Sequence, residues 1–217
     1  MISENLNSIR LQIPNNVCLV AVSKTKSKEL ILEAYNIGQR HFGENKVQEL
    51  SEKASVLPQD ICWHLIGHLQ TNKVKYIAEF VYLIHAVDSL KLLQEINKQA
   101  QKHKRVISCL LQFHIAEEET KFGLSREEAK LLLSSESFRE LQNIQIVGVM
   151  GMASFVEDKI QITNEFKNLH AIFIEIKNDF FLEQVSFKEI SMGMSGDFQL
   201  AIEEGSTIVR IGSSIFT

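Results

Sequence analysis

The sequence lacks several features that define whole classes of protein. No uninterrupted apolar run approaches the ~18 residues that a membrane-spanning helix needs. Residues 1–16 include Glu4 and have no apolar central segment, so we expect no secretory signal there. The formal net charge of −4 provides no basic surface for nucleic acid or for an anionic membrane. We therefore predict a protein that binds neither membranes nor nucleic acids.

Cysteine is scarce and shows no metal-site spacing. Cys18, Cys62 and Cys109 are far apart and lie in apolar, strand-like segments. An odd number of such cysteines is typical of core thiols in a reducing compartment. His64 and His68 are four residues apart, but the end of a predicted strand separates them, so we do not expect a helical zinc pair. The sequence thus predicts a cytoplasmic protein without a metal site.

Motifs for nucleotide binding and for acyl transfer are also missing. The chain has no GxSxG, Walker or dinucleotide-binding fingerprint, and no linker, repeat or low-complexity segment. With 217 residues, of which 45% are hydrophobic and 23% charged, it can bury one sizeable core. We therefore expect residues 1–217 to form a single domain.

The sequence does contain a regular alternation of strand-like and helical segments. Strands are predicted at residues 17–24, 41–45, 61–67, 81–88, 105–115, 144–152, 187–193 and 207–216. Helices are predicted at residues 3–12, 27–38, 46–57, 71–80, 90–104, 125–141, 158–178 and 196–204. This alternation favours an α/β fold of the (β/α)8 TIM-barrel type over an open doubly wound sheet. The extra N-terminal helix is expected to cover the position after the last strand.

The strand at residues 17–24 ends unusually. Its apolar run stops at Ser23, and the last residue of the strand is Lys24 rather than a turn former. Side chains alternate along a strand, so Val22 and Lys24 share one face. If that face is the barrel interior, Lys24 lies at the C-terminal ends of the strands, where barrels of this type bind ligands. Alternatively, Lys24 begins a solvated basic loop with Lys26 and Lys28, as most lysines are exposed.

Two segments rich in glycine and serine follow the last two predicted strands. Four of the ten glycines fall between residues 193 and 212, and three of these four lie within SMGMSG (191–196) and RIGSS (210–214). Glycine lets backbone N–H groups approach an anion, and serine hydroxyls add donors. A helix expected to begin near Ser195 would add its N-terminus. Since such barrels commonly hold phosphate after strands seven and eight, we favour a phosphate site over ordinary turns.

Arg210 stands within the otherwise apolar segment TIVRIGS. An inward-pointing guanidinium must be paired, and a structural salt bridge with Glu203 or Glu204 is one interpretation. The other places Arg210 near Lys24, because the first and last strands are neighbours in a closed barrel. A lysine beside a fixed cation in an enclosed site is more readily neutral and nucleophilic. An amine, a phosphate site and an apolar barrel mouth together suggest pyridoxal 5′-phosphate (PLP), held as a Schiff base.

Seven segments, in order along nearly the whole chain, resemble the motifs of a known family. They are LVAVSKTK (19–26), HFGENKVQE (41–49), WHLIGHLQTNK (63–73), KFG (121–123), VGVMGM (147–152), ISMGMSGDFQLAI (190–202) and GSTIVRIGSSIF (205–216). On these motifs the chain resembles the pyridoxal phosphate homeostasis proteins, also called the YggS or PROSC family. The resemblance implies the fold type III PLP-binding barrel, which is similar to the N-terminal domain of alanine racemase.

The resemblance also implies roles for individual residues. The implied cofactor-binding residues are Lys24, Asn45, Ile66, Gly67, Ser195, Arg210, Gly212 and Ser213. Lys24 would hold PLP as a Schiff base, and Arg210 would meet the pyridine nitrogen and keep it unprotonated. The ring would then be a poor electron sink. The residues at positions 45, 66 and 67 would lie around the ring, and those at 195, 212 and 213 would hold the phosphate.

The chain departs from the family pattern at three places. His68 replaces the proline that is usual in IGPLQ, and Lys46 replaces an aromatic residue in FGENYVQ. The sequence ends at Thr217, where the family pattern usually continues. These differences concern the rim of the expected site and leave its phosphate motif intact.

The resemblance implies cofactor binding without established turnover. Racemases of this fold use a second domain and a partner's tyrosine, which this chain is not expected to supply. We expect a monomer that takes part in intracellular PLP (vitamin B6) homeostasis, with PLP-dependent apoenzymes as partners and no catalytic residue. One alternative is a PLP-dependent amino-acid racemase or decarboxylase, which needs a second acid/base group. Another is a cofactor-free aldolase that forms a Schiff base through Lys24.

Overall fold

The computed structural model describes residues 2–117 and 122–217, and within these ranges eight parallel strands form a closed barrel in sequence order. The strands are β1 (Cys18–Val22), β2 (His41–Glu44), β3 (Cys62–Leu65), β4 (Leu83–Val87), β5 (Ile107–Gln112), β6 (Ile144–Met150), β7 (Glu189–Ser191) and β8 (Ile208–Ile211). Strand β1 pairs with both β2 and β8, which closes the barrel. The predicted (β/α)8 barrel is confirmed, and the open doubly wound sheet is wrong.

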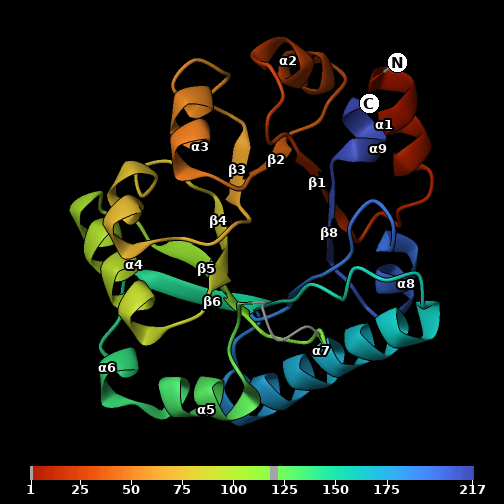
Figure 1. The fold of residues 1–217 in the computed structure, drawn as a ribbon. Coiled ribbons are helices and arrows are strands. Elements are labelled where there is room, and N and C mark those ends of the chain that lie inside the picture. The colour runs from red at the N-terminus through yellow and green to blue at the C-terminus, as the bar shows by residue number, and fades with distance from the viewer. Residues whose placement is uncertain (1, 118–121) are drawn as a thin grey trace.

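Helices surround the barrel (Figure 1). They are α1 (Ile2–Arg10), α2 (Lys28–Asn36), α3 (Val47–Ala54), the 3-10 helix η1 (Thr71–Tyr76), α4 (Leu90–Lys102), α5 (Arg126–Ser134), α6 (Glu136–Arg139), α7 (Lys159–Phe180), α8 (Phe198–Glu203) and α9 (Ser213–Phe216). In the described part of the chain, none of these helices is both long and apolar enough to cross a membrane.

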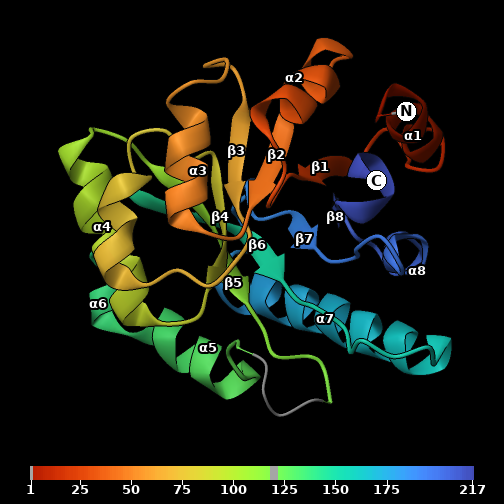
Figure 2. The ribbon, with the colours of Figure 1, turned by 45° about the horizontal axis from the view of Figure 1, so that its top comes forward.

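Helix α1 lies beside α9, where the two ends of the chain meet (Figures 1 and 2). Asn5 of α1 donates from Nδ2 to the carbonyl oxygen of Ile215 at 3.2 Å. Leu6 on the same helix is fully buried. The N-terminal helix therefore covers the position that follows β8, as predicted.

The barrel interior contains an apolar cluster separate from the larger core between strands and helices. The buried members of this inner cluster are Val20, Leu83, Ala86, Leu110, Met150 and Ile208. The three cysteines are free thiols; Cys109 is buried, whereas Cys18 and Cys62 are only partly buried. The prediction of core thiols is thus confirmed for Cys109, whereas Cys18 and Cys62 lie at the margin of the core.

Several local predictions are wrong. The helix expected at residues 71–80 is the shorter 3-10 helix η1, in which only Val74 is buried. The helix expected at 125–141 is divided into α5 and α6, because Ser135 ends the first and its hydroxyl accepts a bond from Phe138 N at the start of the second. The strand expected at 207–216 ends at Ile211, since the backbone of Gly212 turns the chain into α9.

Candidate functional site

A cavity of about 620 Å3 lies at the C-terminal ends of the strands, within the usual range for small-molecule sites. All eight residues predicted to bind a cofactor line it: Lys24, Asn45, Ile66, Gly67, Ser195, Arg210, Gly212 and Ser213. Side chains that the sequence did not single out also line it, among them Gln112, Met152, Met194 and Asp197. The eight predicted residues converge because they lie in, or shortly after, the C-terminal ends of five strands of one barrel, β1, β2, β3, β7 and β8.

Lys24 lies two residues beyond β1, so the prediction that the strand extends to this lysine is wrong. The chain turns here: Lys26 N donates to Ser23 O at 3.0 Å, and Thr25 has a left-handed φ of 63°. Lys24 nevertheless lines the cavity together with Val22 and remains exposed to solvent. Lys26 has a different role from Lys24, because its Nζ donates to the carbonyl oxygen of Phe216 and it does not line the cavity.

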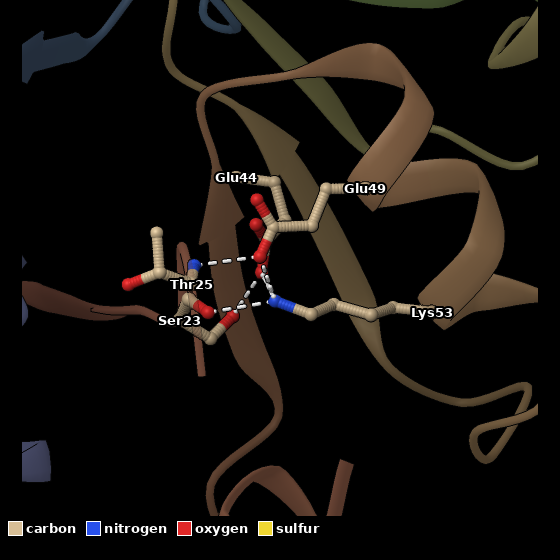
Figure 3. A network of polar contacts seen from close by, with 5 residues as sticks. All are labelled: Ser23, Thr25, Glu44, Glu49 and Lys53. Carbon is tan, nitrogen blue, oxygen red and sulfur yellow. Dashed lines mark hydrogen bonds and ion pairs between the residues drawn. The ribbon is translucent and has the colours of Figure 1, made fainter. Parts of the chain in front are cut away.

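A buried ion pair holds the residue that precedes Lys24 (Figure 3). Lys53 of α3 donates from Nζ to Ser23 O and to Glu44 Oε1, each at 2.7 Å. The hydroxyl of Ser23 donates to the same Glu44 oxygen at 2.5 Å. The Glu44 side chain is fully buried, and burial raises its pKa, which the bonds from Lys53 and Ser23 oppose. These contacts fix the end of β1 against β2 and α3.

Thr25, the residue that follows Lys24, is held by Lys53 through a second carboxylate, that of Glu49 (Figure 3). Glu49 Oε1 accepts from Thr25 N at 2.6 Å and from Lys53 Nζ at 2.7 Å. The turn that carries Lys24 is thus anchored on both sides. The sequence analysis missed this network, although the i, i+4 spacing of Glu49 and Lys53 on one helix is a signal for the pair.

The two glycine-serine segments meet at one side of the cavity. Gly212 N donates to Ser195 Oγ at 3.3 Å, and Arg210 N donates to Gly193 O at 2.9 Å. The helix expected near Ser195 begins only at Phe198 and has six residues. The donors at this rim are therefore loop N–H groups and serine hydroxyls, without a long helix behind them.

The guanidinium of Arg210 is buried, with 4% of the residue exposed, and lines the cavity from below. It donates from Nη1 to Ser191 Oγ at 2.5 Å and from Nη2 to Gly151 O at 3.1 Å. These are its partners, so the interpretation as a salt bridge with Glu203 or Glu204 is wrong. Burial lowers the pKa of Arg210 to about 10, which leaves it a cation at neutral pH.

At the rim, His68 stacks on Phe122 with ring centroids 4.6 Å apart, and its Nδ1 lies 3.5 Å from Asp88 Oδ2. Both rings line the cavity, so the departure at His68 changes the rim itself. Lys46 instead occupies the N-cap position of α3. Residues 118–121, which include the first residue of the KFG motif (121–123), lie outside the described residues.

The arrangement is suited to a phosphorylated aldehyde. An accessible amine, hydroxyl and N–H donors, a fixed guanidinium and apolar walls such as Ile66 face one cavity. An amine captures an aldehyde covalently, and the donors of the glycine-serine segments bind an anion. Among the residues that the structure describes, no group of three or more histidine, cysteine, aspartate or glutamate side chains could hold a metal ion.

Comparisons with known proteins agree with this arrangement. A family model described as alanine racemase, N-terminal domain, matches residues 1–217. The pyridoxal phosphate homeostasis protein of Aquifex aeolicus is 41% identical over 199 residues, which cover 91% of this chain and 85% of that protein. Two solved structures of PipY from Synechococcus elongatus cover both chains fully. The one without PLP has a TM-score of 0.93 at 36% identity, and the one with PLP bound has 0.89 at 35%.

Proposed function

Because this chain belongs to the family of pyridoxal phosphate homeostasis proteins, we propose that it binds PLP in the cavity at the C-terminal ends of the strands, as a Schiff base on Lys24. The observation that carries this proposal is the convergence of Lys24, Arg210 and the glycine-serine segments on one cavity. The PLP-bound structure of PipY, which matches the whole chain, supports the choice of cofactor.

The residues present fit the cofactor. PLP supplies an electrophilic aldehyde and a phosphate when it is bound. The amine of Lys24 matches the aldehyde, and Ser195, Gly212 and Ser213 supply donors for the phosphate. Ile66 offers an apolar surface for the ring. The cavity volume of about 620 Å3 is sufficient for a ligand of this size.

Arg210 favours a role without turnover. A guanidinium only donates hydrogen bonds and stays charged, so Arg210 would keep a ring nitrogen that faces it unprotonated. That state weakens the ring's ability to accept electrons. Relatives such as those of Aquifex aeolicus and humans carry the name of homeostasis proteins. The chain therefore retains PLP and releases it to PLP-dependent apoenzymes in the cytoplasm.

The first test is reconstitution with PLP. Purified protein mixed with PLP is expected to develop a visible absorption band, and borohydride is expected to fix the cofactor on the peptide that contains Lys24. A protein that stays colourless, or a label on another lysine, would contradict the proposal. Loss of α-deuterium from amino acids in the presence of the loaded protein would instead indicate a racemase or decarboxylase.

The glycine-serine rim gives a prediction about selectivity. Ser195→Ala combined with Ser213→Ala is expected to weaken PLP binding by about 100-fold or more, because hydrogen bonds to charged groups contribute ~1.5–3 kcal/mol each. Binding of pyridoxal, which lacks the phosphate, should change little. Fluorescence titration with both ligands measures the difference. Ser214→Ala is the matched control, because Ser214 is exposed and next to the rim. Equal losses for both ligands would rule out phosphate binding here.

A further inference from the structure

Three histidines and a serine form a continuous hydrogen-bonded chain across the barrel. His41 Nδ1 lies 2.9 Å from His64 Nε2, and His64 Nδ1 lies 2.8 Å from His85 Nε2. His85 Nδ1 lies 2.9 Å from Ser191 Oγ, which accepts the 2.5 Å bond from Arg210. The first three residues lie on adjacent strands, but β4 and β7 are not neighbours. The bond between His85 and Ser191 therefore crosses the barrel interior.

The middle of this chain is closed to solvent. His64 is 1% exposed, and His85 and Ser191 are fully buried. Burial lowers the pKa of both His64 and His85 well below the ordinary value, and the neighbouring His41 and Arg210 act in the same direction. Both imidazoles are thus neutral at pH 7, and a neutral imidazole has one N–H donor and one acceptor nitrogen.

Arg210 determines the donor and the acceptor of every bond in this hydrogen-bonded chain. Its guanidinium can only donate, so Ser191 Oγ accepts and directs its own proton to His85 Nδ1. His85 then carries its proton on Nε2 and donates to His64 Nδ1, and His64 donates from Nε2 to His41 Nδ1. In the opposite direction Ser191 would accept two bonds and leave its buried proton without a place in the chain, which is costly.

The hydrogen-bonded chain connects the two ends of the barrel. Arg210 lines the cavity at the C-terminal ends of the strands. His41 and His64 line a second cavity of about 610 Å3 at the N-terminal ends, together with Tyr82 and Glu189. The rings of Tyr82 and His41 pack in a T-shaped arrangement, with centroids 5.4 Å apart. The buried end of the chain thus meets the guanidinium, and its outer end meets an open cavity.

We propose that Ser191, His85 and His64 are positioning residues that hold Arg210 in place beneath the cofactor cavity through this one-way chain. Ser191 occupies Nη1 of the guanidinium, and the histidines behind it keep the hydroxyl oriented to accept. The bonds to Ser191 Oγ and Gly151 O then fix the orientation of the guanidinium, and with it the directions of its remaining N–H groups. The expected effect on PLP binding rests on the proposed function, but the direction of the hydrogen bonds between Arg210 and His41 does not.

The direct test is to measure histidine tautomers in the protein without PLP. Long-range 1H–15N spectra of histidine-labelled protein are expected to show His64 and His85 neutral and protonated on Nε2 between pH 6 and 8. A charged imidazole, or a proton on Nδ1 of either residue, would overturn the proposal. Variants His64→Gln and His85→Gln serve to assign the signals.

A second test perturbs the contact between the chain and Arg210. Ser191→Ala is expected to release His85 from its single tautomer, to shift the visible absorption of bound PLP and to weaken PLP binding by about tenfold. Ser108→Ala is the control, because Ser108 lines the second cavity outside the chain. An Ser191→Ala protein with wild-type tautomers, spectrum and affinity would contradict the role of the chain. Absence of PLP binding by the wild type would contradict the proposed function alone, since the tautomers are measured without PLP.

Discussion

Lys24→Ala is expected to abolish the visible absorption band that PLP produces with the wild-type protein. The amine is the group that forms the covalent bond to the aldehyde, and alanine offers no nucleophile in its place. The phosphate rim and Arg210 remain, so PLP should still bind non-covalently, at least about tenfold more weakly. Absorbance and fluorescence titrations measure the two effects separately.

Lys28→Ala is the matched control for this experiment. Lys28 lies four residues further along the chain, at the start of α2, and is exposed. It should keep the band and the affinity of the wild type. Retention of a borohydride-reducible band by Lys24→Ala would show that another amine captures the aldehyde, and the proposed site would then be wrong. The thermal unfolding of both variants should match the wild type, since neither lysine is buried.

Lys53→Met is expected to reduce the free energy of unfolding by about 3–5 kcal/mol, the usual cost of breaking a buried ion pair. The substitution leaves the buried carboxylate of Glu44 with only the hydroxyl of Ser23 as a partner. The other oxygen of Glu44, Oε2, already has no hydrogen-bond partner among the described residues. Urea denaturation gives the change in stability. PLP binding should also weaken, because Ser23 O and Glu49, which hold the turn that carries Lys24, both lose their bond to Lys53 (Figure 3).

Two further variants separate the ion pair from general effects of the substitution. Lys98→Met removes an exposed lysine that lies 4.0 Å from Glu95, and such pairs contribute at most about 1 kcal/mol. Glu44→Leu combined with Lys53→Met removes both buried charges and should regain much of the lost stability. Its PLP binding should remain weak, because Ser23 stays unanchored. A wild-type stability for Lys53→Met would exclude a structural role for this pair.

The order of the barrel elements could be read from the sequence because each strand and helix has its own local pattern. Apolar runs and their polar ends are encoded within about ten residues, so the eight strands were found. Their lengths were overestimated, as in β1, which ends before Lys24. The division between α5 and α6 was missed because apolar spacing continues across Ser135, while the capping hydroxyl ends one helix and begins the next.

The cavity residues could also be predicted, since a closed barrel brings all strand ends to one face. For that reason Lys24, Arg210 and the glycine-serine segments were expected to lie together from their positions alone. The motif resemblance then indicated the cofactor. The i, i+4 spacing of Glu49 and Lys53 indicates one ion pair near Lys24, but no local pattern shows which residues hold Ser23 or Arg210.

The sequence by itself determined the barrel, the face that binds ligands and the residues at that face, because all three follow from the periodicity and ends of single elements. Only the tertiary structure decided the partners of the buried polar groups. Lys53 meets Ser23, and His85 meets Ser191, across 30 and 106 residues of chain. Such bonds form when distant strands close around a dry interior, where each donor must find an acceptor. The spacing of these residues in the sequence does not indicate which of them pair.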